Sequence, residues 1–123
     1  MPDTFMFTTG DPAVAVVAQR TATPGLIVHA TPVGDGWRLA HRGTGYALGQ
    51  FDRYTPALAA ARSLFGVADW TAGPETLQKE TVIWKVIDAI EGAGGQFLSL
   101  RGGLGEQVAA KRSRYLAAQG SIA

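Results

Sequence analysis

Residues 26–51, LIVHATPVGDGWRLAHRGTGYALGQF, decide the fold. Two glycine-rich clusters, Gly34-Asp35-Gly36 and Gly43-Thr44-Gly45, have the composition of tight turns and divide the stretch into three segments. In the middle segment, bulky residues alternate with arginine and alanine, which is the period of two typical of a half-buried strand. The stretch therefore predicts a three-stranded antiparallel meander, with strands at 26–33, 37–42 and 46–51.

A helix is expected at residues 55–65, directly after the meander. Thr55 suits the N-cap position, Pro56 suits the first helical position, and Gly66 suits the end of the helix. The apolar residues of this segment fall on one side of the helix and are expected to lie against the sheet. They are Leu58, Ala61, Leu64 and Phe65.

Two further helices are expected at residues 74–91 and 106–119. In the first of them, Glu75 and Lys79 have the i,i+4 spacing of a supporting ion pair. Its segment 81–87 (TVIWKVI) has strand propensity as well, but apolar residues recur there at helical spacing, which favours a helix. The residues of this apolar stripe are Val82, Ile83, Val86, Ile87 and Ile90.

The two ends of the chain add short segments. Residues 4–9 (TFMFTT) predict a strand, residues 12–20 are balanced between helix and strand, and residues 96–100 predict a short strand. The sequence therefore predicts a single α+β domain over residues 1–123. Its antiparallel sheet of three to five strands, built on the meander at 26–51, packs against two or three helices.

Composition limits the functions to consider. The chain has 123 residues, of which 46% are hydrophobic and 17% charged, and its net charge is +1, so a basic site must come from local clustering. The absence of cysteine excludes disulfides, thiolate zinc sites and cysteine nucleophiles. With no signal peptide visible and no apolar run longer than residues 13–18, we expect a soluble, cytoplasmic protein without a membrane partner.

His29 and His41 are the first candidates for a site, and the register of their strands decides whether they meet. If Gly34-Asp35-Gly36 is a three-residue loop, His29 lies opposite His41; if Asp35-Gly36 is a two-residue loop, His29 faces Arg42. No carboxylate lies near them in sequence to complete a ligand set. We therefore expect ordinary half-buried strand histidines and no metal.

A second candidate is the Gly-rich segment at 102–105 (GGLG), before the helix expected at 106–119. Val108 stands where a dinucleotide-binding fingerprint needs its third glycine, and no P-loop lysine follows. The segment is read as a turn. Because no serine lies in a nucleophile motif and no carboxylates are spaced as a catalytic pair, we expect a non-catalytic protein without cofactor.

Basic and aromatic residues are the remaining candidates. The first basic cluster, on the outward face of the meander and just beyond it, is Arg38, Arg42 and Arg53. The second, near the C-terminus, includes Lys111, Arg112 and Arg114. Trp70 and Trp84 are expected to be core residues or anchors for a protein partner.

Residues 36–65 also carry a resemblance. Trp37 opens the middle strand, Leu48-Gly49-Gln50-Phe51 lies in the third, and an alanine-rich helix follows. This pattern resembles the three-strand-plus-helix DNA-binding domains of ethylene-response factors and of integrase arm-type domains. The resemblance implies a sheet laid into the major groove of DNA, with Arg38 and Arg42 in the positions that read base edges.

Two functions follow as hypotheses. The first is a small DNA-binding or regulatory accessory protein that contacts double-stranded DNA through the sheet face and the basic C-terminal helix. The alternative is a protein–protein interaction module that buries surface around Trp70 and Trp84, either in another protein or in a homodimer.

Overall fold

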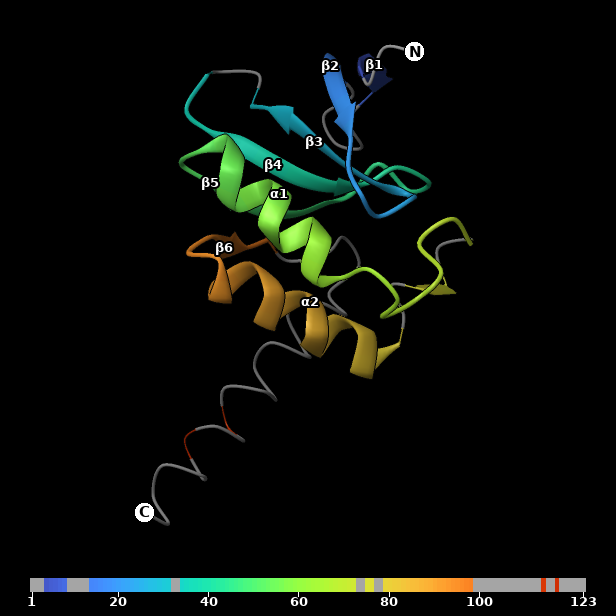
Figure 1. The fold of residues 1–123 in the computed structure, drawn as a ribbon, viewed down its shortest axis with the longest axis vertical. Helices are drawn as coiled ribbons and strands as arrows, with labels where there is room; N and C mark the ends of the chain where they lie inside the picture. The colour runs from blue at the N-terminus through green and yellow to red at the C-terminus, as the bar shows by residue number, and fades with distance from the viewer. Residues whose placement is uncertain are drawn as a thin grey trace.

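A six-stranded antiparallel sheet with two helices on one face forms the structure, a computed structural model (Figure 1). The α+β class is confirmed, with one strand more than the largest number expected. Residues 4–8, 14–31, 34–72, 75–76, 79–98, 114 and 117 are described. The elements are β1 (Thr4–Thr8), β2 (Ala15–Arg20), β3 (Leu26–Ala30), β4 (Trp37–His41), β5 (Ala47–Phe51), α1 (Tyr54–Ser63), α2 (Glu80–Gly92) and β6 (Gln96–Phe97).

The sheet is an uninterrupted meander, because its strand order is the order of the chain. Residues 15–20, where helix and strand propensities were balanced, form β2 and pair with β1 from Thr4↔Gln19 to Thr8↔Ala15. The β-branched pair Val16 and Val17 suits a strand, where such side chains lose less rotamer freedom than in a helix.

The main core lies between the sheet and the helices. Leu26, Val28 and Leu39 from the strands meet the small buried face of α1, which is formed by Ala57, Ala60 and Ala61. Alanines let the helix approach the sheet closely. The expectation that Phe65 packs on the sheet is wrong: α1 ends at Ser63, and the Phe65 side chain is 66% exposed.

Both helices begin at residues other than those expected. Arg53, not Thr55, is the N-cap of α1, and Pro56 stays within the first turn, where a missing N–H breaks no intrahelical bond. Helix α2 begins at Glu80 rather than Pro74, so Glu75 is not part of the helix and no helical pair with Lys79 forms. The apolar stripe of α2 is confirmed, with all five of its residues buried: Val82, Ile83, Val86, Ile87 and Ile90.

The opposite face of the sheet carries a second, smaller core. Phe7 from β1, Ala18 from β2, Ile27 from β3 and Ala40 from β4 form one buried cluster. These four residues come from neighbouring strands of the sheet, and β1 and β2 turn away from the direction of β3 and β4 (Figure 1). The face that we expected to point outward from the meander is therefore largely buried.

The register of β3 and β4 differs from both alternatives considered for the histidines. Strand β3 ends at Ala30, and His29 pairs with Arg38 while His41 pairs with Leu26. Thr31 closes the connection: its N–H donates to the Gly36 carbonyl, and its hydroxyl accepts from the Asp35 N–H. Relative to the pairing of His29 with His41, the partner of His29 is shifted by an odd number of residues, so His29 and His41 lie on opposite faces of the sheet.

The C-terminal expectations fall mostly beyond the described residues. Strand β6 covers two residues of the strand expected at 96–100. The Gly-rich segment at 102–105 and most of the helix expected at 106–119 lie outside the described ranges, with Arg114 and Ala117 described as helical. Among the helices of the described part of the chain, none is long and apolar enough to cross a membrane.

Candidate functional site

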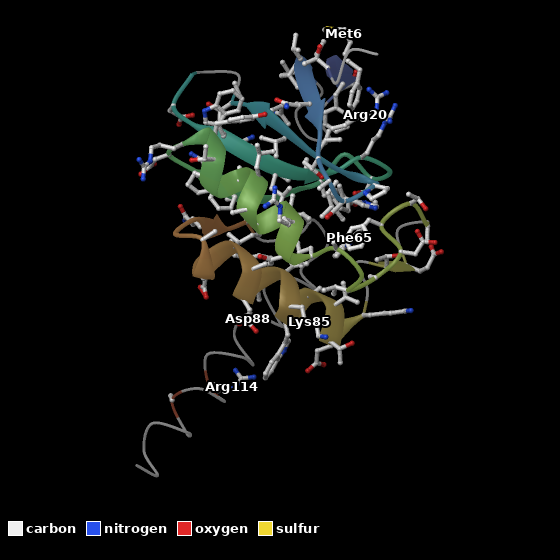
Figure 2. All side chains as sticks on the ribbon, in the orientation of Figure 1. Met6, Arg20, Phe65, Lys85, Asp88 and Arg114 are labelled. Carbon is white, nitrogen blue, oxygen red and sulfur yellow. The ribbon has the colours of Figure 1, made fainter. Side chains whose placement is uncertain are left out.

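Two arginines converge on one aromatic ring at an end of the sheet. The guanidinium carbon (Cζ) of Arg20 lies 4.7 Å from the ring centroid of Phe5, and that of Arg42 lies 4.3 Å from the same centroid. Both arginines are exposed and Phe5 is half-buried. These distances are within the range of cation–π attraction, which holds two positive charges near each other on the surface (Figure 2 labels Arg20).

The topology explains why these residues meet. Arg20 ends β2 and Arg42 directly follows β4; the pairings Arg20↔Ile27 and Leu26↔His41 bring both to the same end of the sheet. Phe5 arrives from the edge strand β1 because the sheet coils toward this face. We call this group, Phe5, Arg20 and Arg42, the arginine cluster.

A hollow of about 310 Å³ lies beside the arginine cluster. Both arginines line it, together with the hydroxyl-bearing side chains of Thr21 and Thr71 and the turn at Pro24-Gly25. In that turn, the Leu26 N–H donates to the Thr23 carbonyl and Gly25 has φ 91°, which are the features of a type II turn. No carboxylate is found among the described residues that line the hollow.

Asp69 is the carboxylate next to this site, and it lines an adjacent hollow. Its Oδ1 accepts hydrogen bonds from the Thr71 N–H and hydroxyl, at 3.0 and 2.5 Å. These bonds favour the ionised form and lower the pKa of Asp69 below its usual value. The Asp69 carboxylate is thus engaged by Thr71 in its own turn.

Charge is divided unevenly over the structure. None of the described strands contains Asp or Glu, and the strands carry the cations Arg20 and Arg38, with Arg42 just beyond β4. Helix α2 is acidic on balance, because Glu80, Asp88 and Glu91 outnumber Lys85. The site therefore lies on the more basic side of the molecule despite a net charge of only +1.

The structure separates the basic residues that the sequence analysis grouped. Arg53 follows β5, which runs antiparallel to β4, so Arg53 and Arg42 lie at opposite ends of the meander. Arg38 lies on the same face as Arg42 but is half-buried, and its Nε is buried without a hydrogen-bond partner in the described part of the chain. Arg114 is exposed, while Lys111 and Arg112 are outside the described residues.

Both histidines are buried, and their rings make different hydrogen bonds. His41 Nε2–H donates to the Trp70 carbonyl at 2.8 Å, and its Nδ1 accepts from the Thr44 hydroxyl at 2.9 Å. His29 Nδ1–H donates to the Ala30 carbonyl at 2.8 Å. Burial lowers the pKa of each below 6.5, and Arg38 lowers that of His29 further.

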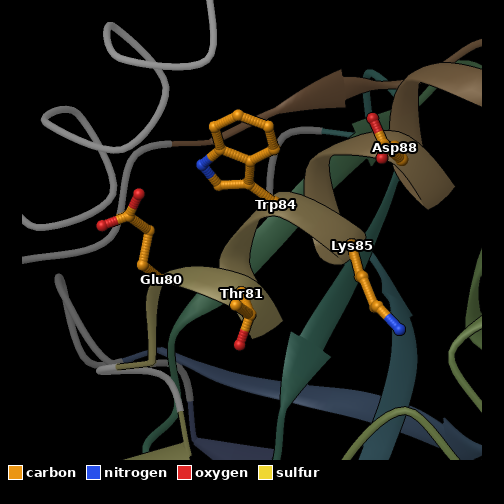
Figure 3. A pocket seen from close by; sticks show the side chains of 5 residues that line it. All are labelled: Glu80, Thr81, Trp84, Lys85 and Asp88. Carbon is orange, nitrogen blue, oxygen red and sulfur yellow. The ribbon is translucent and has the colours of Figure 1, made fainter.

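The two candidate tryptophan anchors differ in exposure. Trp70 is buried in the main core, and its Nε1–H donates to the Leu64 carbonyl at 3.0 Å, so its ring is not on the surface. Trp84 is half-buried on α2, beside a pocket of about 420 Å³. Figure 3 shows Trp84 and Glu80 projecting from the same side of the helix. The role of Trp84 as a partner anchor stays a prediction.

The arrangement of the described side chains bears on which ligands the site could hold. Within the described ranges, no group of three or more His, Asp or Glu side chains is arranged to hold a metal ion. Both ring nitrogens of His41 and the Nδ1 of His29 take part in hydrogen bonds within the fold. The arginine cluster instead offers guanidinium N–H donors, which match the oxygens of phosphate or carboxylate groups.

Sequence analysis missed two of the three residues of this cluster. Arg20 lies in the segment whose structure was undecided, and Phe5 lies on a strand for which no neighbour was assigned. The period-two pattern that placed Arg42 on one face was the signal that could have found Arg20, once residues 15–20 were taken as a strand.

Comparison of the chain with family models, with curated proteins and with solved structures finds no match.

Proposed function

We propose that the protein is a non-catalytic DNA-binding protein that holds the phosphate backbone with Arg20 and Arg42. The observation that carries the proposal is the arginine cluster: two exposed guanidinium groups on one ring, beside a hollow whose described lining has no carboxylate. Stacking on Phe5 restricts both side chains before binding, so less conformational entropy is lost when they meet phosphate.

Backbone contact is favoured over reading of base edges. The resemblance places Arg38 among the base-reading residues, but Arg38 is half-buried and its neighbours Ala40 and His29 are 1% exposed. A face that carries its own core cannot lie open in a groove of DNA. Arg20 and Arg42 remain accessible at the rim, where contact with phosphates requires no particular base sequence.

Removing both charges should weaken DNA binding and its dependence on salt. We expect the double variant Arg20→Gln/Arg42→Gln to bind a random-sequence duplex about tenfold or more weakly at low salt. Each lost phosphate contact should also reduce the slope of log affinity against log salt by about 0.9. Fluorescence anisotropy between about 50 and about 200 mM salt measures both quantities.

The matched control is Lys79→Gln/Lys85→Gln, which removes the same charge from exposed positions at α2. This control should retain most of the affinity and the native slope. Equal losses in the two double variants would show that only net charge matters. Absence of binding by the native protein at low salt would disprove the proposal. Far-ultraviolet circular dichroism checks that each variant is folded.

A further inference from the structure

Strand β1 forms an edge of the sheet without the usual protection. It pairs with β2 on one side, and in the described part of the chain no strand pairs with its other side. Its sequence, Thr4-Phe5-Met6-Phe7-Thr8, contains no charged residue and no proline. Natural proteins commonly place lysine, proline or a bulge on such an edge, because its free N–H and C=O groups accept another strand.

The same hairpin exposes an apolar pair. Met6 is 66% exposed and Val17, directly opposite it on β2, is 61% exposed (Figure 2 labels Met6). Both lie on the face against which α1 and α2 pack further along the sheet. The helices make most of their sheet contacts with β3 to β6, and α1 reaches β2 through the hydrogen bond from the Tyr54 hydroxyl to Gln19. Met6 and Val17 thus form an exposed apolar surface next to the open edge of β1.

The sequence of β1 indicates which strand would pair with its open edge. Thr-Phe-Met-Phe-Thr reads the same in both directions about Met6. We propose that β1 pairs antiparallel with β1 of a second copy of this chain, with a two-fold axis at Met6. The axis would set Met6 opposite Met6, Phe5 opposite Phe7, and Thr4 opposite Thr8, so each residue meets one of its own type.

This pairing joins the two sheets into one and gives each exposed methionine an apolar neighbour. Because Phe5 and Phe7 lie on one face and Met6 on the other, the alternation of faces continues across the axis. The interface is small, so we expect an equilibrium between monomer and dimer that shifts with concentration. The inference does not depend on DNA binding: Phe5 is the one residue of the arginine cluster on β1, and Met6, at the axis, does not belong to that cluster.

A single charge at the axis should dissociate the dimer. In Met6→Lys, two lysines face each other across the axis, and we expect the dimer to weaken about tenfold or more. The matched control is Phe65→Lys, since Phe65 is also 66% exposed and lies beyond α1, away from β1. Sedimentation velocity over a concentration series should show dimer for the native protein and for the control, and monomer for Met6→Lys.

The absence of cysteine allows a second test that does not rely on weakening the fold. The axis would hold the thiols of two Met6→Cys chains within disulfide reach, so mild oxidation should give a covalent dimer. In Val17→Cys the thiols would be about 14 Å apart, three strand spacings, and should not join. A native protein that stays monomeric together with Met6→Cys chains that do not cross-link would overturn the proposal.

Salt separates this proposal from the proposed function. Pairing at Met6 brings two arginine clusters onto the same face, so added salt screens their repulsion and should leave the dimer as strong or stronger. DNA binding should weaken in the same titration. A dimer that dissociates as salt is added would contradict the pairing described here, whatever the result with DNA.

Discussion

Replacing Gly25 with alanine is expected to destabilise the protein by about 3 kcal/mol or more, through backbone strain and a backbone clash. Gly25 has φ 91°, which L side chains rarely adopt. An added Cβ would lie 2.5 Å from the carbonyl carbon and oxygen of Trp70. That carbonyl accepts the hydrogen bond from His41, so the clash would also disturb a buried polar contact. Urea denaturation followed by circular dichroism measures the loss.

Gly66 provides the matched control. Its φ of 79° imposes a similar strain, but an added Cβ would meet no atom within 4 Å. Gly66→Ala should therefore cost only about 1–2 kcal/mol, the cost of a left-handed residue. If the two variants lost the same stability, the close packing of the turn at Pro24-Gly25 against Trp70 would be refuted.

Acidification should destabilise the protein well above the pH at which carboxylates titrate. His29 and His41 have folded-state pKa values lowered from 6.5 by burial, so the unfolded chain takes up their protons first. The stability that the two neutral histidines contribute is fully present above pH 6.5. It is lost as the pH falls from 6.5 toward their folded-state pKa values. The loss approaches about 1.4 kcal/mol per pH unit for each histidine. Urea denaturation at intervals from pH 7.5 to 5.5 measures it.

His41→Gln isolates the contribution of one ring. Glutamine keeps an N–H donor for the Trp70 carbonyl but does not titrate. At pH 7.5 the variant should be less stable than the native protein, because the bond with the Thr44 hydroxyl is lost. Its stability should fall less steeply between pH 6.5 and 5.5. A slope equal to that of the native protein would exclude His41 as a source of the pH dependence.

The elements with a strong local pattern were the ones that sequence predicted well. The stripe of α2 recurs at helical spacing over residues 82–90, and every member is buried. The three strands of the meander were likewise marked by turn residues on both sides. In these segments propensity, periodicity and turn chemistry agree, which is the condition for a reliable prediction.

The register of β3 and β4 depended on contacts that periodicity does not encode. Side-chain hydrogen bonds between Thr31 and Asp35 close the connection and end β3 three residues early. Pro32, which has no N–H for a ladder, was the available signal for an early end. Relative to the three-residue loop, which would pair His29 with His41, the register shifts by an odd number of residues, so His29 lies on the face opposite His41.

The arginine cluster could not be predicted because it depends on three structural conditions that must hold together. Residues 15–20 had to be a strand, β1 had to pair with it, and the sheet had to coil until Phe5 reached Arg42. Coiling follows from strand twist and from the small residues Ala18 and Ala40 beneath the aromatic rings. It is a property of the assembled sheet rather than of any one segment.

The central claim, that Arg20 and Arg42 hold phosphate, can be observed directly in the nitrogen–proton spectrum of the arginine side chains. On addition of a random-sequence DNA duplex at low salt, the Nε–Hε signals of Arg20 and Arg42 should shift, while that of Arg62 on α1 should not. Both shifts should reverse when salt is added. If DNA binds and the Arg20 and Arg42 signals stay in place, the arginine cluster is not the binding site.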